Sequence, residues 1–293
     1  MSPKDFLLAL VIVIAWGVNF VVIRVGLDGM PPMLLGALRF TLAAFPAILF
    51  VKRPQISLYW LFAYGLTISF GQFAFLFSAM YVGMPAGLAS LVLQAQALFT
   101  FGFAVIFLNE KFRSQNIIGL VIAAVGLMVI GLKGGHAMTI AGFLLTLCAA
   151  SSWALGNIVL RKIGKVDLLG LVVWGSLIPP LPFISLSLLF EGPHRIAMVF
   201  THISMLSVLA VLYLAFVATL LGYSLWGHLL SRYPTMQVAP FSLLVPIIGL
   251  ISAAALLGER WSLAEIIGAI LVMGGLVVNM FGGWLLRRLV PAR

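Results

Sequence analysis

The sequence predicts an all-α polytopic membrane protein, with ten transmembrane helices arranged as two inverted five-helix repeats. Of its 293 residues, 63% are hydrophobic and 8% are charged, and the mean hydropathy is +1.21. Soluble domains keep about a quarter of their residues charged, so most of this surface must face lipid. An internal duplication and an uneven distribution of basic residues supply the rest of the prediction.

Ten apolar stretches are each long enough to cross a hydrocarbon core of about 30 Å as a helix. The breaks between them contain glycine, proline and charged residues, which are typical of helix ends and turns. The connections are too short to hold a water-soluble domain. We expect the spans at 5–26, 33–51, 58–81, 86–108, 115–132, 138–160, 168–190, 204–230, 236–257 and 263–285.

An internal repeat divides the chain. Residues 108–127 align without gaps with residues 257–276, and Glu110 matches Glu259 among the identical positions. Chance does not explain this match, and self-similarity at a fixed offset indicates duplicated structure. Further matched pairs are Pro85/Pro234, Trp16/Trp153 and Arg24/Arg161. We therefore expect a first repeat over 1–135 and a second over 136–293, with five spans in each.

Because five is an odd number, the second repeat must enter the membrane from the opposite side. Charge counting tests this, since short cytoplasmic loops collect Lys and Arg. With both termini cytoplasmic, the inside residues are Lys4, Lys52, Arg53, Lys111, Arg113, Arg161, Lys162, Lys165, Arg232, Arg287, Arg288 and Arg293. The outside residues are Arg24, Lys133, Arg195 and Arg260. This imbalance predicts a multi-pass protein with both termini in the cytoplasm, and it accounts for the net charge of +10 without a nucleic-acid partner.

The motif Trp16-Gly-Val-Asn19, the five-plus-five repeat and the glutamate–basic pairs that end the fourth and ninth spans resemble the EamA-type drug/metabolite transporters. The likeness covers essentially the whole chain, and it is nearest to the YddG-type exporters of aromatic amino acids. The resemblance implies export of neutral or aromatic amino acids, or similar zwitterionic metabolites, across the bacterial inner membrane. Inverted repeats imply alternating access to a site near the midplane.

Polar residues inside spans are the first candidates for a transport pathway, because hydrocarbon makes them costly unless they are paired. Trp16 and Asn19 share a face of the first helix, and Trp153 and Asn157 share a face of the sixth. Amides and indole rings suit a zwitterion with an apolar side chain, although interhelical packing explains them equally well. The other candidate lining residues are Gln72, Gln94, Gln96, Tyr223 and Ser242. Gln94 and Gln96 lie about 200° apart around a helix, so only one can face a cavity.

Prolines inside spans are candidate hinges, because each removes a backbone hydrogen bond and favours a kink. Static bends that shape a cavity are the equal alternative. The candidates for gating are Pro46, Pro179, Pro180, Pro182, Pro240 and Pro246.

The scarcity of charged residues within the spans limits the classes of substrate that the protein can carry. The seven acidic residues lie at or beyond helix ends, which disfavours proton-coupled efflux of lipophilic cations. Arg39 is the one basic residue within a span, and we expect it to snorkel to the outer interface. Substrates with phosphate groups would need several buried basic residues, so a neutral or zwitterionic solute is favoured. Uniport and proton linkage both stay open.

Three rival classes are weighed against this prediction. A membrane enzyme would need a nucleophile with a base or clustered metal ligands, and none of the four histidines is expected to lie near an acid; no catalytic residue, metal or cofactor is predicted. A non-transporting scaffold or sensor would not need amides and indoles at mid-span. Multidrug efflux and nucleoside or metabolite export are the alternatives within the transporter class. The expected partners are a small-molecule substrate and the lipid bilayer, and the sequence indicates no oligomeric state.

Overall fold

The computed structural model describes residues 1–110, 114–133 and 138–289, and every regular element within them is a helix. The predicted repeat boundary at 135/136 and the residues Lys111, Arg113 and Arg293 lie outside this part. Within it, nine helical stretches are long and apolar enough to span a membrane, and a shorter apolar helix covers Ile117–Leu132. The nine are Pro3–Gly29, Pro32–Leu49, Leu58–Tyr81, Ala86–Leu108, Ile140–Ile163, Leu168–Glu191, Met205–Arg232, Ala239–Leu257 and Leu263–Phe281. The prediction of an all-α polytopic membrane protein is confirmed.

Several spans are built from more than one helix. The first five spans contain α1 (Pro3–Gly29), α2 (Pro32–Ala44), α3 (Leu58–Tyr64), α4 (Gln72–Tyr81), α5 (Ala86–Val92), α6 (Gln96–Leu108) and α7 (Ser114–Lys133). The second half of the chain contains α8 (Ile140–Ile163), α9 (Leu168–Gly175), α10 (Pro180–Leu186), α11 (Pro193–Thr201), α12 (Met205–Leu212), α13 (Gly222–Arg232), α14 (Thr235–Val238), α15 (Leu244–Leu257) and α16 (Leu263–Leu289).

Two π-helical segments interrupt matching spans of the two repeats. One is Gly65–Gly71, between α3 and α4, and the other is Tyr213–Leu221, between α12 and α13. In the second, Thr219 Oγ1 donates to the carbonyl of Leu214, five residues earlier, at 2.8 Å. Such segments are rare and frequently occur at functional sites. The side chains that they position are therefore candidates for a role in transport.

Four of the six candidate prolines lie at breaks in helical geometry, whereas Pro182 and Pro246 lie in the first turns of α10 and α15. After α2 ends at Ala44, Pro46 precedes a 3₁₀ turn over Ala47–Leu49. The chain turns after α9 and restarts at Pro180, while Pro240 lies in the 3₁₀ turn Ala239–Leu243. These prolines shape the spans, and their gating role stays a prediction.

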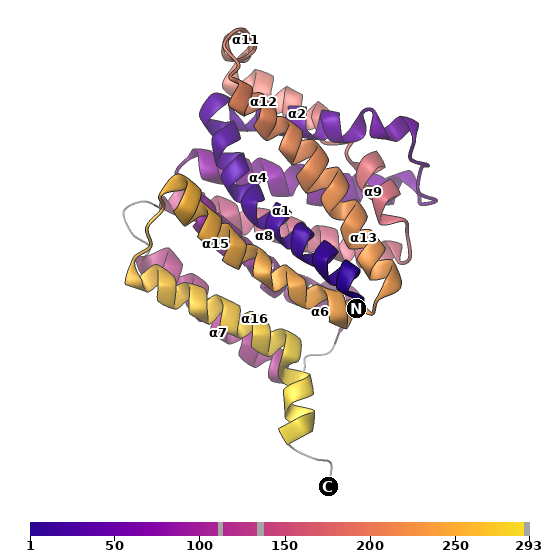
Figure 1. The fold of residues 1–293 in the computed structure, drawn as a ribbon, viewed down its shortest axis with the longest axis vertical. Helices are drawn as coiled ribbons and strands as arrows, with labels where there is room; N and C mark the ends of the chain where they lie inside the picture. Colours follow the sequence, from indigo (N-terminus) through magenta and orange to yellow (C-terminus); the bar gives the residue numbers. More distant parts are fainter. Residues whose placement is uncertain (111–113, 134–137, 290–293) are drawn as a thin grey trace.

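The connections between spans gather at two opposite ends of the bundle. At the Asp5 end, the start of α1 contacts the turn after α13, and the end of α6 contacts the end of α8. At the Glu191 end, that residue contacts the start of α2, and the turn after α15 contacts the start of α5. In Figure 1, α11 projects from the Glu191 end, and α7 and α16 lie side by side along one edge.

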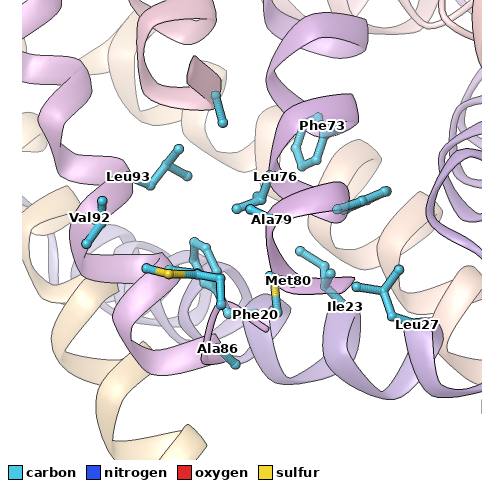
Figure 2. Packing of buried hydrophobic residues seen from close by; sticks show 14 of the residues in the cluster. Phe20, Ile23, Leu27, Phe73, Leu76, Ala79, Met80, Ala86, Val92 and Leu93 are labelled. Carbon is cyan, nitrogen blue, oxygen red and sulfur yellow. The ribbon is translucent and has the colours of Figure 1, made fainter. Parts of the chain in front are cut away.

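The main hydrophobic core lies in the half of the bundle nearer the Glu191 end. Side chains of α1, α4 and α5 interlock there, as Figure 2 shows for Phe20, Ile23, Phe73 and Met80. Phe77, on the next turn of α4, is fully buried. Close packing of this kind holds together the halves of these helices that lie nearer the Glu191 end.

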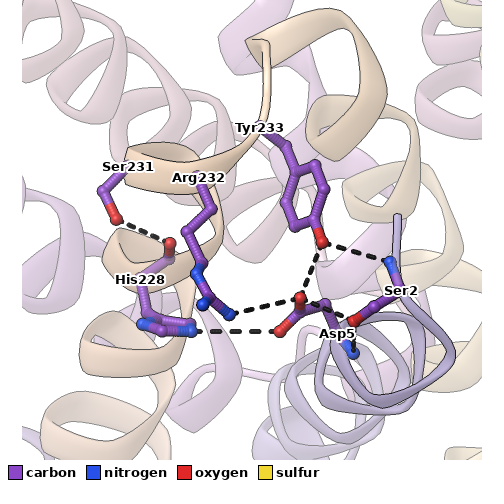
Figure 3. A network of polar contacts seen from close by, with 6 residues as sticks. All are labelled: Ser2, Asp5, His228, Ser231, Arg232 and Tyr233. Atoms are coloured by element: carbon purple, nitrogen blue, oxygen red, sulfur yellow. Dashed lines mark hydrogen bonds and ion pairs between the residues drawn. The ribbon is translucent and has the colours of Figure 1, made fainter.

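The first residues of each proposed repeat contact the connection between the third and fourth spans of the other one. At the Asp5 end, the Tyr233 hydroxyl donates to Asp5 Oδ2 at 2.7 Å and accepts from the backbone N–H of Ser2 (Figure 3). At the Glu191 end, Thr139 Oγ1 donates to the carbonyl of Val82 at 2.8 Å. The same pairing of segments at opposite ends is what an inverted duplication produces.

The network at Asp5 also corrects one expectation. His228 Nε2 lies 3.9 Å from Asp5 Oδ1, so a histidine does lie near an acid. Arg232 Nη1 lies 3.5 Å from the other carboxylate oxygen (Figure 3). Because α13 brings both basic groups to the start of α1, the proximity is invisible in the linear sequence.

Candidate transport pathway

Trp16 joins the first and eighth spans. Its indole Nε1 donates to the carbonyl of Ala218 at 2.9 Å, within the π-helical segment Tyr213–Leu221. Its ring lies 5.4 Å, between centroids, from both Tyr223 and Trp226. Two predicted lining residues, Trp16 and Tyr223, are thus brought together in one aromatic cluster.

Asn157 joins the sixth and fourth spans. Its Nδ2 donates to Gln96 Oε1 at 3.0 Å and to Thr100 Oγ1 at 3.1 Å. Two predicted residues therefore meet, and Thr100, one turn beyond Gln96 on α6, was missed. The signal for it was available, because residues four apart on a helix share a face. Gln94 lies instead in the turn Leu93–Ala95 that separates α5 from α6.

Trp153 and Ser242 make different contacts from those predicted for a shared site. Trp153 packs against two hydrophobic clusters, at the places where α8 meets the third span. Ser242 Oγ donates to the carbonyl of Ala239 at 2.7 Å, within its own turn. Their predicted role as lining residues stays a prediction.

Asn19 and Gln72 place polar atoms deep in the apolar bundle. Their side chains are 7% and 3% exposed, and Asn19 Oδ1 and Gln72 Oε1 have no hydrogen-bond partner. A buried acceptor without a partner is costly, and native proteins contain few of them. Such atoms are therefore candidates for binding a ligand with N–H donors.

Arg39 does not snorkel to the interface, and the expectation that it would do so is wrong. It is 2% exposed, and its guanidinium stacks over the ring of Phe73 at 4.0 Å. Its Nε and Nη2 donate to Thr219 Oγ1 at 3.3 and 3.1 Å. Aromatic rings and a hydroxyl from neighbouring spans thus hold the charge inside the bundle, which composition alone could not reveal.

Three helices pack tightly in the half of the bundle nearer the Glu191 end. There α1, α5 and α15 cross so closely that a Cβ on Gly17 would lie 2.5 Å from Ile248, and a Cβ on Gly249 would lie 2.4 Å from Ser90 Oγ. Beyond this crossing, a cavity of about 420 Å³ opens outward, with Leu88 among its lining residues.

At this end, two glutamates accept hydrogen bonds from backbone N–H groups at the starts of helices. Glu259 accepts hydrogen bonds from the backbone N–H groups of Ala86 and Gly87 at 2.6 and 3.0 Å. Glu191 accepts in the same way from Met33 and Leu34 at 2.6 and 3.1 Å. Carboxylates are favourable at helix starts, because unpaired N–H groups and the helix dipole attract negative charge.

The helices of the fourth span differ in burial, and the glutamate at its Asp5 end has a different partner. All of α5 is buried, whereas in α6, which the structure describes in full, only Ala104 is buried. Glu110, the counterpart of Glu259, accepts from Arg161 Nη1 at 2.8 Å, and both side chains are about half exposed. The matching glutamates at the two ends therefore have different partners.

The sequence was compared with known proteins. The model of the EamA-like transporter family matches residues 4–132 and 140–281. The chain belongs to this family. It is 54% identical to a probable amino-acid metabolite efflux pump of Salmonella typhimurium and 51% identical to one of Escherichia coli, over 96% of each chain.

More distant proteins agree with this assignment. A probable terminal-alkyne amino-acid exporter of Streptantibioticus cattleyicolor is 27% identical over 91% of this chain and 90% of its own. A solved crystal structure superimposes on 100% of this chain and 99% of its own, with a TM-score of 0.67 at 19% identity, which shows the shared fold. This EamA-family chain is thus a multi-pass membrane transporter of a small molecule and not an enzyme.

Proposed function

We propose that this transporter exports neutral amino acids, aromatic ones included, or closely related zwitterionic metabolites. The observation that carries the proposal is its identity of 51–54%, over 96% of the chain, with two proteins named as probable amino-acid metabolite efflux pumps.

The polar atoms inside the bundle support the proposal. The unpartnered oxygens of Asn19 and Gln72 can accept hydrogen bonds from an ammonium group. The aromatic cluster of Trp16, Tyr223 and Trp226 offers a surface for an apolar side chain and, through its ring faces, for a cation. A quaternary lipophilic cation would use the ring faces without needing the amide acceptors, because it has no N–H donor.

Export by alternating access is supported by the difference between the two ends. Glu259 holds the turn after α15 to the start of α5, while Glu110 is paired with Arg161. Arg24, the counterpart of Arg161, pairs instead with Asp28 at 3.1 Å. In the proposed cycle the arrangements exchange: Glu259 leaves α5 and pairs with Arg24, while Glu110 leaves Arg161 and binds the start of α14.

The orientation follows from charge. We infer that the Asp5 end faces the cytoplasm of a bacterial inner membrane, because most of the basic residues lie in the connections at that end. The state described here is then the one in which Glu259 binds the outer end of α5, and an exported solute would enter from the Asp5 end.

Uptake by proteoliposomes tests the proposed substrate. Purified transporter would be supplied with labelled neutral amino acids, with nucleosides and with quaternary ammonium compounds, and protein-free liposomes would serve as the control. We expect uptake of one or more neutral amino acids, with the other classes at background. Transport of nucleosides or cations alone would overturn the assignment.

A further inference from the structure

Arg39 is a positive charge inside the bundle whose hydrogen-bonding capacity is only partly used. Nε and Nη2 share the hydroxyl of Thr219, whereas Nη1 is buried and has no hydrogen-bond partner. Among the residues that the structure describes, no carboxylate lies within ion-pair distance of it. A charged residue at membrane depth is rare and usually functional.

The surroundings of Arg39 fix the guanidinium without neutralising it. Three rings surround it, with centroids 4.0 Å away for Phe73, 5.4 Å for Phe40 and 6.0 Å for Phe77. Ring faces attract a cation, but they leave Nη1 without an acceptor. The site therefore holds a preoriented positive group that lacks a negative partner.

A small enclosed cavity lies against this group. It measures about 10 Å³, and its polar lining comes from Arg39, Tyr64, Ser69, Ser176, Thr219 and Tyr223. Ser69 and Thr219 belong to the π-helical segments of the third and eighth spans, so two of the three described π-helical segments contribute to this one cavity. This volume admits a single water-sized group.

The cavity adjoins the candidate pathway through Tyr223. One side of this residue lines the cavity, and its ring contacts Trp16. A solute bound at the aromatic cluster would reach the guanidinium once the wall formed by Tyr223 moves aside. Because the cavity holds only a water-sized group, binding of a carboxylate would also require its lining to move apart.

The chemistry of the cavity selects a singly charged, planar anion. A guanidinium N–H and several hydroxyls donate to the two oxygens of a carboxylate, whereas a phosphate dianion would need further cations. We propose that Arg39 determines specificity by binding the carboxylate group of the transported solute. The inference rests on the proposed function for the identity of that solute.

The test measures ligand-induced thermal stabilisation of the purified protein. Two ligand series separate the chemical groups: L-phenylalanine, its amide, 3-phenylpropionate and 2-phenylethylamine, and the matching set built on L-methionine. We expect the compounds with a carboxylate to stabilise the unaltered protein and the amides and amines to have little effect. In Arg39→Gln the apparent affinity for carboxylates should fall by about tenfold or more, since a hydrogen bond to a charged group is lost.

Two further variants keep the test decisive. Arg195→Gln makes the same chemical change at an exposed arginine, which contacts Tyr81, and should leave ligand binding unaltered. Arg39→Lys retains the charge without the planar fork. If the glutamine variant does not fold, the lysine variant provides the test: we expect it to fold and to bind carboxylates several-fold more weakly than the unaltered protein.

Three results would overturn the inference: stabilisation by the amides equal to that by the acids, unchanged carboxylate affinity in the Arg39 variants, or no stabilisation by any carboxylate. Stabilisation by carboxylates that depends on Arg39, in a protein that transports no amino acid, would retain this subsite and contradict the proposed function.

Discussion

Glu110 and Glu259 occupy matching places in the two repeats, but their carboxylates have different partners. Glu259 accepts from two backbone N–H groups at the start of α5, at 2.6 and 3.0 Å. Glu110 accepts from the Arg161 guanidinium at 2.8 Å. One sequence element thus makes different contacts at opposite ends of the bundle, as the proposed inverted repeats imply, and the proposed cycle requires these contacts to exchange.

Neutralising either glutamate should shift the balance between the two states in opposite directions. In Glu259→Gln the contact with α5 loses its charge, and a loss of about 1 kcal/mol changes the population ratio about fivefold. A cysteine at Met84, which is 1% exposed, should then react faster with a membrane-impermeant maleimide in a background where Cys148 is replaced. Glu110→Gln should make the same cysteine react more slowly, because it weakens the contact with the start of α14 that Glu110 makes in the exchanged state. Equal changes in both variants would contradict the exchange.

The crossing of α1, α5 and α15 should not tolerate an added methyl group. In Gly249→Ala the new Cβ would meet Ser90 Oγ at 2.4 Å and Ser90 Cβ at 2.7 Å. Overpacking of this kind costs about 1–3 kcal/mol, so we expect a lower melting temperature and slower transport. Gly102→Ala is the matched control, because a Cβ added there would meet nothing within 4 Å. Similar losses in both variants would argue against tight packing here.

The hydrogen bond between Asn157 and Gln96 should appear as energetic coupling. Asn157→Ala leaves the Gln96 and Thr100 acceptors unpaired, and in a double-mutant cycle contacting residues typically couple by about 0.5–3 kcal/mol. The cycle would be measured by thermal unfolding in detergent. If these side chains also line the pathway, Asn157→Ala should change the ratio of uptake rates for large and small neutral amino acids. Additive stabilities with an unaltered ratio would leave no functional role for the pair.

The network at Asp5 should contribute more to stability than an exposed ion pair does. Asp5→Asn weakens the contacts with Tyr233 and Arg232, and a carboxylate that accepts several hydrogen bonds loses more on neutralisation than one in a single exposed pair. Asp28→Asn is the comparison, because the side chains of Arg24 and Asp28 are 41% and 59% exposed and such pairs contribute about 0–1 kcal/mol. Thermal unfolding should show the larger loss for the Asp5 variant, and the reverse order would contradict this account.

Much of the fold could be predicted from the sequence, because lipid exposure leaves a strong signal along the chain. The spans lie close to their predicted limits, and the break at Pro46 coincides with a change of helical geometry. The π-helical segments could not be predicted, since no residue type specifies them. Gly65–Gly71 and Tyr213–Leu221 depend on packing between spans.

The sequence named candidate residues for the pathway but not the contacts that they make. Gln96 and Asn157 were both expected to line a pathway, yet their hydrogen bond depends on how α6 and α8 lie against each other. Arg39 was misjudged for the same reason: its distance from the helix start suggested the interface, while its partner Thr219 comes from a span far along the chain. Sequence periodicity assigns a residue to a helix face, whereas the neighbour of that face comes from the tertiary structure.

Counterflow in proteoliposomes tests most directly whether this protein carries amino acids by alternating access. Vesicles would be loaded with an unlabelled neutral amino acid and diluted into a trace of the same compound in labelled form. The account predicts a transient accumulation of label above its equilibrium level, which an open pore cannot produce, and a much smaller overshoot in Arg39→Gln. Equilibration without an overshoot for every neutral amino acid would contradict the account.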